Sequence, residues 1–234
     1  MSPELTKTLK RLAWVAGGFL ILVLVIAAME RRSGSPVDRL DIQINTLPGG
    51  YRLIDSTDVR TLIYNSFGYH MEGQSQNLIN VDRLERVIEE DEFVLDAEAH
   101  INLQDEVEIE IWQREPVLRI IDNNGLNYYL DKSGSKLSLS KHFTARVLVV
   151  TGDLPPFSND FLEREDHVLK DLFELAQLIR NNEFYQSLIE QIHVTKSGFT
   201  FIPKVGDQKI KFGHFEYAQE KLKKLKVFYK EGLP

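Results

Sequence analysis

The sequence contains no cysteine. This absence excludes a disulfide framework, a thiolate zinc site, an iron–sulfur cluster and a cysteine nucleophile. Also absent are the H-E-x-x-H, G-x-S-x-G, P-loop and G-x-G-x-x-G motifs, and none of the six histidines lies three or four residues from another. Local spacing therefore supports no catalytic, cofactor-binding or metal-ligating residue, although residues distant in the sequence can still meet in space.

Positive charge is scarce over most of the chain. The net charge is -7, whereas residues 1–29 hold three basic residues against Glu4, so residues 30–234 carry -9. Nucleic-acid binding depends on neutralising phosphates, which makes this acidic portion a poor candidate for it. We expect no nucleic-acid partner.

One long apolar run stands out. Residues 12–29 contain no charge and no proline. As a helix with a rise of ~1.5 Å per residue they would be about 27 Å long, close to the roughly 30 Å hydrocarbon core of a bilayer. Because no second run of this kind exists, we predict a single membrane span.

A cleaved signal peptide is the other interpretation of this run, with residues 25–27 as the cleavage site. The run is longer than a signal-peptide core of ~7–15 residues, and charged residues follow it directly, which favours an uncleaved anchor. The positive-inside rule does not decide the orientation, because each flank holds three basic residues: Lys7, Lys10 and Arg11 on one side, Arg31, Arg32 and Arg39 on the other.

Residues 30–36 are a polar linker, and the segment after it mixes strand and helix periodicities. Alternating apolar residues predict strands, and apolar residues three and four apart predict helices. Asp55 with Asp58, and Asn80, are helix caps, and Gly68 is a helix stop. The predicted order is strand, helix, helix, strand, strand: 37–46, 55–67, 80–88, 97–103 and 107–111. Glu106, Glu108 and Glu110 share one face of the last strand, which should be solvated because like charges repel.

Proline cannot donate within a central strand, so Pro116 indicates a boundary. Beyond it we predict an α+β fold, a mainly antiparallel β domain with flanking helices. The predicted strands are 117–122, 127–131, 146–151, 189–195, 199–203 and 208–212, and the predicted helices are 169–179 and 215–229. Asp131 beside Gly134 is expected to build a turn, and Trp112, Tyr128 and Tyr129 are expected to pack.

The last helix carries lysines opposite its apolar face: Lys221, Lys223, Lys224 and Lys226. Two interpretations stay open. The face is either simply solvated, or it is a docking surface for an acidic partner or for anionic lipid headgroups.

The segments 113–120, 128–134 and 145–152 resemble the bacterial cell division family FtsQ (DivIB). The segments 189–194 and 202–206 are similar to its later strands, in the form found in the Bacteroidetes group. The order of tail, span, strand-helix-helix-strand-strand unit and β domain is also that of the family, so the resemblance covers nearly the whole chain.

The resemblance implies a cytoplasmic tail at 1–11, a transmembrane helix at 12–29, a linker at 30–36, a POTRA domain at 37–116 and an FtsQ-type β domain at 117–234. It implies a non-enzymatic scaffold of the inner membrane at the division septum, with residues 30–234 in the periplasm. The implied partners are FtsB and FtsL, with recruitment through FtsK and regulation of FtsW and FtsI. No cofactor or small-molecule substrate is implied.

The sequence departs from the family at its end. Relatives continue past the last helix into a final edge strand that carries much of the FtsB contact, whereas this sequence ends at Pro234. We therefore expect strand 208–212 to be an unpaired edge, and we carry over no contact residues.

Two rival functions remain. A POTRA-containing envelope assembly or secretion factor shares the first unit, but such proteins usually carry several units or a transmembrane barrel. A membrane-anchored envelope hydrolase would need a pocket in which dispersed His, Ser and Asp side chains converge.

Overall fold

The computed structural model describes residues 14–27 and 34–232. The chain divides into two compact units. Unit 1 comprises residues up to Asn45 together with Ser56–Asp91 and Asp96–Ile111, and unit 2 comprises Thr46–Asp55, Glu92–Leu95 and the rest of the chain from Trp112. The predicted tail 1–11 and the chain end at Pro234 lie outside the described residues, as does most of the predicted linker.

Residues 14–27 form a helix whose large apolar side chains are exposed, from Trp14 to Ile26. Within residues 14–27 and 34–232, no helix combines the length and the apolar character needed to cross a membrane. The predicted span 12–29 extends beyond this helix on both sides into residues that the structure does not describe.

Unit 1 has the predicted order of strand, helix, helix, strand, strand. Its elements are β1 (Leu40–Ile44), α2 (Ser56–Phe67), a 3-10 turn η1 (Gln76–Leu78), α3 (Val81–Glu89), β2 (Val94–Ile101) and β3 (Val107–Gln113). The sheet order is β1-β3-β2, with β1 parallel to β3. Asn80 caps α3 by accepting a hydrogen bond from the Arg83 amide (2.8 Å), as predicted.

The two faces of the unit 1 sheet differ as the alternation predicts. Val107, Ile109 and Ile111 of β3 are buried. Glu106, Glu108 and Glu110 lie on the other face, where Glu110 is exposed and the other two are half-buried. There Glu106 pairs with Arg39 (2.9 Å), and Glu108 lies 3.2 Å from His100 Nε2. The Arg39 cation offsets part of the repulsion along the strand.

Unit 2 is built on a seven-stranded sheet of order β10-β9-β8-β7-β4-β5-β6. Its strands are β4 (Pro116–Asp122), β5 (Asn127–Asp131), β6 (Lys136–Leu137), β7 (Leu148–Gly152), β8 (Ile189–Thr195), β9 (Gly198–Pro203) and β10 (Ile210–Gly213). Its helices are α4 (Val168–Arg180), α5 (Glu183–Leu188) and α6 (Ala218–Glu231).

The α+β class is confirmed, and most pairings of this sheet are antiparallel, as predicted, whereas the pairings at its centre are parallel. The β4–β7 and β7–β8 pairings are parallel, and the remaining pairings are antiparallel. The chain leaves β7 and returns along β8 through α4 and α5, and a helical crossover of this kind makes the two strands parallel. Pro116 occupies the first position of β4, where a missing N–H is tolerated.

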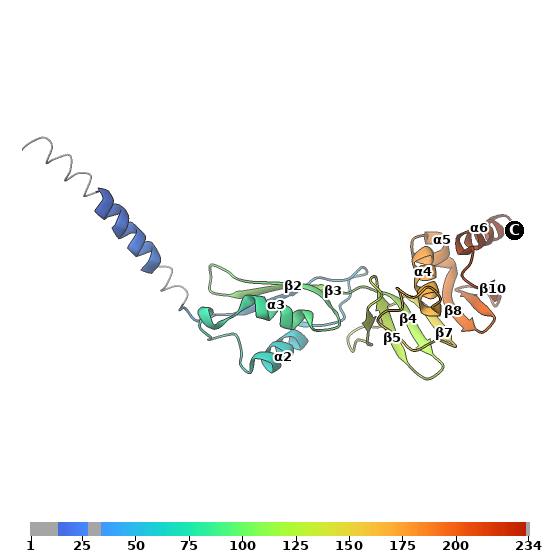
Figure 1. Cartoon of the computed structure of the whole chain (residues 1–234), viewed down its shortest axis with the longest axis horizontal. Coiled ribbons are helices and arrows are strands. Elements are labelled where there is room, and N and C mark those ends of the chain that lie inside the picture. The colour runs from blue at the N-terminus through green and yellow to red at the C-terminus, as the bar shows by residue number, and fades with distance from the viewer. Residues whose placement is uncertain (1–13, 28–33, 233–234) are drawn as a thin grey trace, which may run out of the picture. The chain divides into compact units, whose positions relative to one another are not determined.

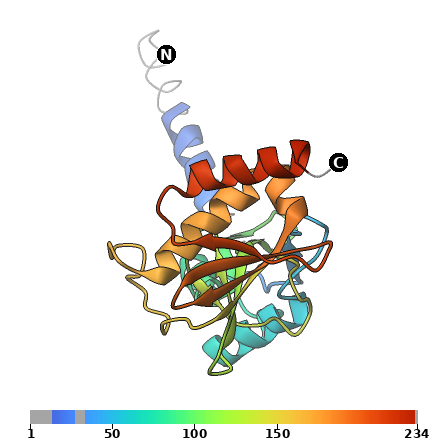
Figure 2. The same ribbon diagram turned by 90° about the vertical axis from the view of Figure 1, so that its right-hand side faces the viewer.

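The main core of unit 2 lies between the sheet and its helices. Strand residues such as Leu118, Val150 and Ile192 are fully buried in one cluster with Leu172 and Leu175 of α4. The helix α6 adds Ala218 and Leu222 to the same cluster. Figures 1 and 2 show α4, α5 and α6 gathered on one side of the sheet.

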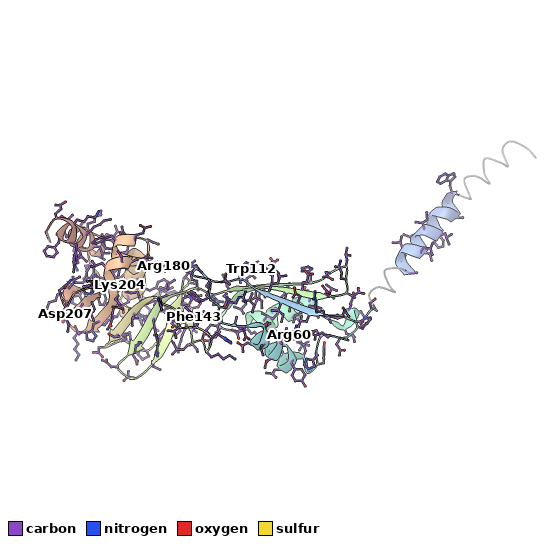
Figure 3. The ribbon with its side chains drawn as sticks, turned by 180° about the vertical axis from the view of Figure 1, so that it is seen from behind. Arg60, Trp112, Phe143, Arg180, Lys204 and Asp207 are labelled. Atoms are coloured by element: carbon purple, nitrogen blue, oxygen red, sulfur yellow. The ribbon has the colours of Figure 1, made fainter. Side chains whose placement is uncertain are left out.

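A smaller core lies around Tyr129 and Leu137 and is covered by Tyr51 and Phe93. Phe143, labelled in Figure 3, stacks on Tyr51 with ring centroids 4.2 Å apart. Segments 46–55 and 92–95 thus contribute to unit 2, although the sequence pattern places them within 37–116. The Gln113 side chain accepts hydrogen bonds from the Leu53 and Ile54 amides (2.7 and 3.4 Å), which fixes the first of these segments.

The predicted turn at Asp131 is confirmed. Its carboxylate accepts hydrogen bonds from the Ser133 and Ser135 amides, both at 2.8 Å, and pairs with Arg114 at 3.1 Å. Tyr128 and Tyr129 are buried, as expected for packing residues.

His167 caps α4, and its side chain accepts a hydrogen bond from the Leu169 amide through Nδ1 (3.2 Å). The residue is only 9% exposed. Burial lowers the pKa of this imidazole, the Arg164 cation lowers it further, and the Asp160 carboxylate opposes both. Protonation of Nδ1 removes the acceptor and therefore the cap.

This cap makes unit 2 sensitive to acid. The unfolded state takes up the proton first, so the stabilisation is present above pH ~6.5 and is lost as the pH falls below it. We expect the free energy of unfolding to drop by about 1 kcal/mol between pH 7.5 and pH 5 through this cap. His167→Asn, which caps without titrating in this range, should show a smaller drop in urea unfolding. Equal drops in both proteins would contradict this account.

Candidate partner-binding edge

β10 lies at one end of the seven-stranded sheet, as expected for strand 208–212. It pairs with β9 along one side, and no described strand pairs along its other side. A free strand edge presents unpaired N–H and C=O groups, onto which another chain can add as a further strand.

Two glycines lie close together where β10 ends. Gly213 has φ +78, and the ladder with β9 is irregular between Lys211 and Gly213. Opposite it, Gly198 has φ +106, and a Cβ placed there would lie 2.6 Å from the Gly213 carbonyl carbon. The two backbones therefore meet at a distance that only glycine permits.

The helix α6 is attached to the strand at both of its ends. Lys221 donates a hydrogen bond to the His214 carbonyl (2.8 Å), and its ammonium lies 5.1 Å from the centre of the Phe212 ring. The Gln208 amide donates to the Tyr229 hydroxyl (3.2 Å). We call β10 together with α6 the C-terminal edge.

The C-terminal edge carries positive charge in an otherwise acidic chain. β10 and α6 together hold six lysines against two acidic residues, whereas the whole chain has a net charge of -7. The lysines are Lys211, Lys221, Lys223, Lys224, Lys226 and Lys230. An excess of one sign on a binding surface steers partners of the opposite sign.

The predicted lysine face of the last helix divides in two. Lys223 and Lys224 are exposed, as expected. Lys221 and Lys226 are half-buried, and Lys226 lies 5.7 Å from the centre of the Phe184 ring of α5. Helical spacing alone missed this difference, because α5 was not predicted.

Two apolar side chains accompany the exposed lysines. Val227 and Phe228 are 52% and 55% exposed on α6. Val227 and Phe228 lie three and four residues beyond Lys224, so the three share one helix face. This face combines apolar contact area with positive charge.

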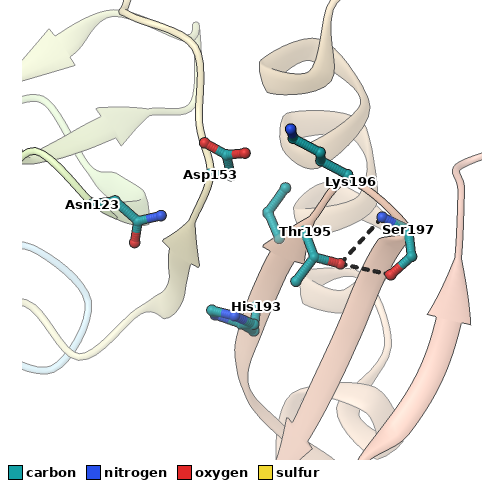
Figure 4. Close-up of a pocket in the computed structure, with 7 residues that line it drawn as sticks. Asn123, Asp153, His193, Thr195, Lys196 and Ser197 are labelled. Carbon is teal, nitrogen blue, oxygen red and sulfur yellow. Dashed lines mark hydrogen bonds between the residues drawn. The ribbon is translucent and has the colours of Figure 1, made fainter.

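The arrangement that a hydrolase requires is only partly present. His193, Asp153 and Ser197 do line one hollow of unit 2 (Figure 4). However, His193 Nδ1 bonds to Thr151 (3.0 Å), and the Ser197 hydroxyl bonds to Thr195 (2.8 Å). No Ser–His hydrogen bond links the two, so no nucleophile is paired with a base in this hollow.

The sequence did not indicate that these residues converge. Asn123, Asp153 and Lys196 directly follow the parallel strands β4, β7 and β8, and the carboxyl ends of parallel strands meet at one sheet edge. A predicted helical crossover between β7 and β8 would have placed these two strands in parallel and their following residues close together.

The structure defines a two-unit α+β protein whose seven-stranded sheet ends at β10, with no described strand along the outer side of β10. Residues 115–234 match the family described as FtsQ/DivIB, C-terminal related. The match covers half of the chain, and the protein belongs to the FtsQ/DivIB family of cell division proteins, which is non-enzymatic. No curated protein matches the chain.

The glycine contact yields a stability prediction. Gly198→Ala should lower the free energy of unfolding by about 3 kcal/mol or more, because the new Cβ meets the Gly213 backbone at a strained φ. Gly125→Ala is the matched control, since it has φ +86 with open space around its Cβ position. It should cost only about 1 kcal/mol. If denaturant unfolding shows the same loss of unfolding free energy for both variants, the close approach of the Gly198 and Gly213 backbones contributes nothing to the cost.

Proposed function

We propose that the protein is a single-pass scaffold of the division machinery that works by binding other division proteins. FtsB and FtsL are its proposed direct partners, FtsK recruits it, and FtsW and FtsI are the septal synthases regulated through it. Membership of the FtsQ/DivIB family supports these roles.

The observation that carries the proposal is strand β10 at the end of the sheet, along whose outer side no described strand pairs. An extended segment of a partner adds to such an edge through main-chain hydrogen bonds. The exposed lysines of α6 favour a partner with acidic side chains near that segment.

The anchoring part of the proposal rests on residues 12–29, which contain no charge. Their described part is a helix with exposed apolar side chains, the kind of surface that lipid would cover. In this proposal residues 1–11 are cytoplasmic, 12–29 cross the inner membrane and 30–36 form the linker. The periplasmic domains are then a POTRA domain at 37–116, supported by its strand-helix-helix-strand-strand order, and a β domain at 117–234.

Depletion of the protein in its host tests the division role. We expect filamentous cells without septa, and a fluorescent fusion of the full chain should gather at the septum. Normal division after depletion would contradict the proposal. Uniform envelope fluorescence would instead favour the envelope assembly or secretion role.

Charge reversal tests the C-terminal edge. The double variant Lys223→Glu/Lys224→Glu should weaken co-purification of FtsB and FtsL by about tenfold, since favourable long-range attraction becomes repulsion. The matched control is Lys141→Glu/Arg146→Glu, which changes two exposed residues of the segment between β6 and β7 by the same charge. Undiminished partner recovery with the α6 variant would exclude its lysines from the interface.

A further inference from the structure

A hollow of about 500 Å³ lies at the carboxyl ends of the parallel strands of unit 2. Asn123 follows β4, Asp153 follows β7, and the turn 195–197 ends β8. The hollow is open to solvent, and five of its seven lining residues are exposed.

The floor of the hollow is fixed by the backbone. The Asn123 amide donates to the Gly152 carbonyl (3.2 Å), and the Asp153 amide donates to the Val194 carbonyl (3.1 Å). Gly152 has φ +111, and a Cβ there would lie 2.2 Å from the Val194 oxygen. The side chains after these strands therefore project from a rigid base.

A chain of hydrogen bonds orients His193. The Gln191 amide donates to the Thr151 hydroxyl (2.7 Å), which lies 3.0 Å from His193 Nδ1. The Thr151 hydroxyl can donate its own proton to Nδ1, and in that arrangement the neutral imidazole carries its N–H on Nε2. In this tautomer His193 is a hydrogen-bond donor at the wall of the hollow.

Two opposite charges face each other across the hollow without neutralising one another. Figure 4 shows Asp153 on one side and Lys196 on the other. Among the described residues, neither side chain forms an ion pair or a side-chain hydrogen bond. The hydroxyls of Thr195 and Ser197, by contrast, bond to each other within the turn (2.8 Å).

We propose that this hollow binds a small zwitterion, an amino acid or short peptide with a free ammonium group and a free carboxylate. Lys196 and His193 hold the carboxylate, and Asp153 holds the ammonium group. Asn123 adds an amide that serves either group. Each ligand charge then meets its opposite, and charge-assisted hydrogen bonds of this kind are roughly twice as strong as neutral ones.

The charged groups of the hollow and the partner-binding side of β10 lie on different strands. β9 lies between β8, which supplies the hollow, and β10, which supplies the edge. Loss of zwitterion binding can therefore be told apart from loss of partner binding.

The test is a titration of the ¹⁵N-labelled full chain in detergent with glycylglycine, followed through the backbone amide shifts of residues 123, 153 and 196. We expect saturable shifts, with binding weakened about tenfold by Asp153→Asn or by Lys196→Gln. Asp207→Asn and Lys204→Gln, labelled positions outside the hollow (Figure 3), are the matched controls and should bind as the parent does.

Blocked dipeptides assign the two charges. N-acetylglycylglycine lacks the ammonium group, so it should bind the parent protein about tenfold more weakly than glycylglycine, and Asp153→Asn should weaken it no further. Glycylglycine amide lacks the free carboxylate, so it should bind the parent protein about tenfold more weakly than glycylglycine, and Lys196→Gln should weaken it no further. Absence of saturable shifts, or equal shifts with all three compounds, would overturn the proposal.

Discussion

The parallel pairing of β4, β7 and β8 is the constraint on which the rest of unit 2 depends. Parallel neighbours need a long crossover, and here α4 and α5 supply it and bring the main apolar core with them. The chain then leaves the centre through the antiparallel strands β9 and β10 and ends the sheet at a free edge. The same pairing places the residues that directly follow β4, β7 and β8 around one hollow.

The C-terminal edge joins two properties that suit it for binding. Backbone groups along β10 supply sequence-independent hydrogen bonding, whereas Lys223, Lys224 and Phe228 on α6 supply charge and apolar area beside it. The contacts of Lys221 and Gln208 hold helix and strand together, so a partner meets one preformed surface. Preformed surfaces lose less conformational entropy on binding.

Most elements could be predicted because their patterns are local. Asn80 caps α3, and the Asp131 carboxylate builds the turn before β6, as expected. What sequence reasoning missed is non-local: the parallel sheet centre, the packing of Tyr51 against Tyr129, and the half-buried state of Lys226 depend on residues far apart in the chain. The lysines of the last helix and the edge strand 208–212 were predicted as possible binding surfaces, whereas the hollow lined by Asp153 and Lys196 depends on strand ends that are far apart in the sequence.

Hydrogen exchange on the full chain, with and without FtsB and FtsL, tests the central claim most directly. If a partner strand adds to the sheet, amides of β10 (Ile210–Gly213) gain protection, while those of β6 (Lys136–Leu137), at the other end of the sheet, stay unchanged. Partner-induced protection elsewhere, with β10 exchanging as in the free protein, would contradict the account.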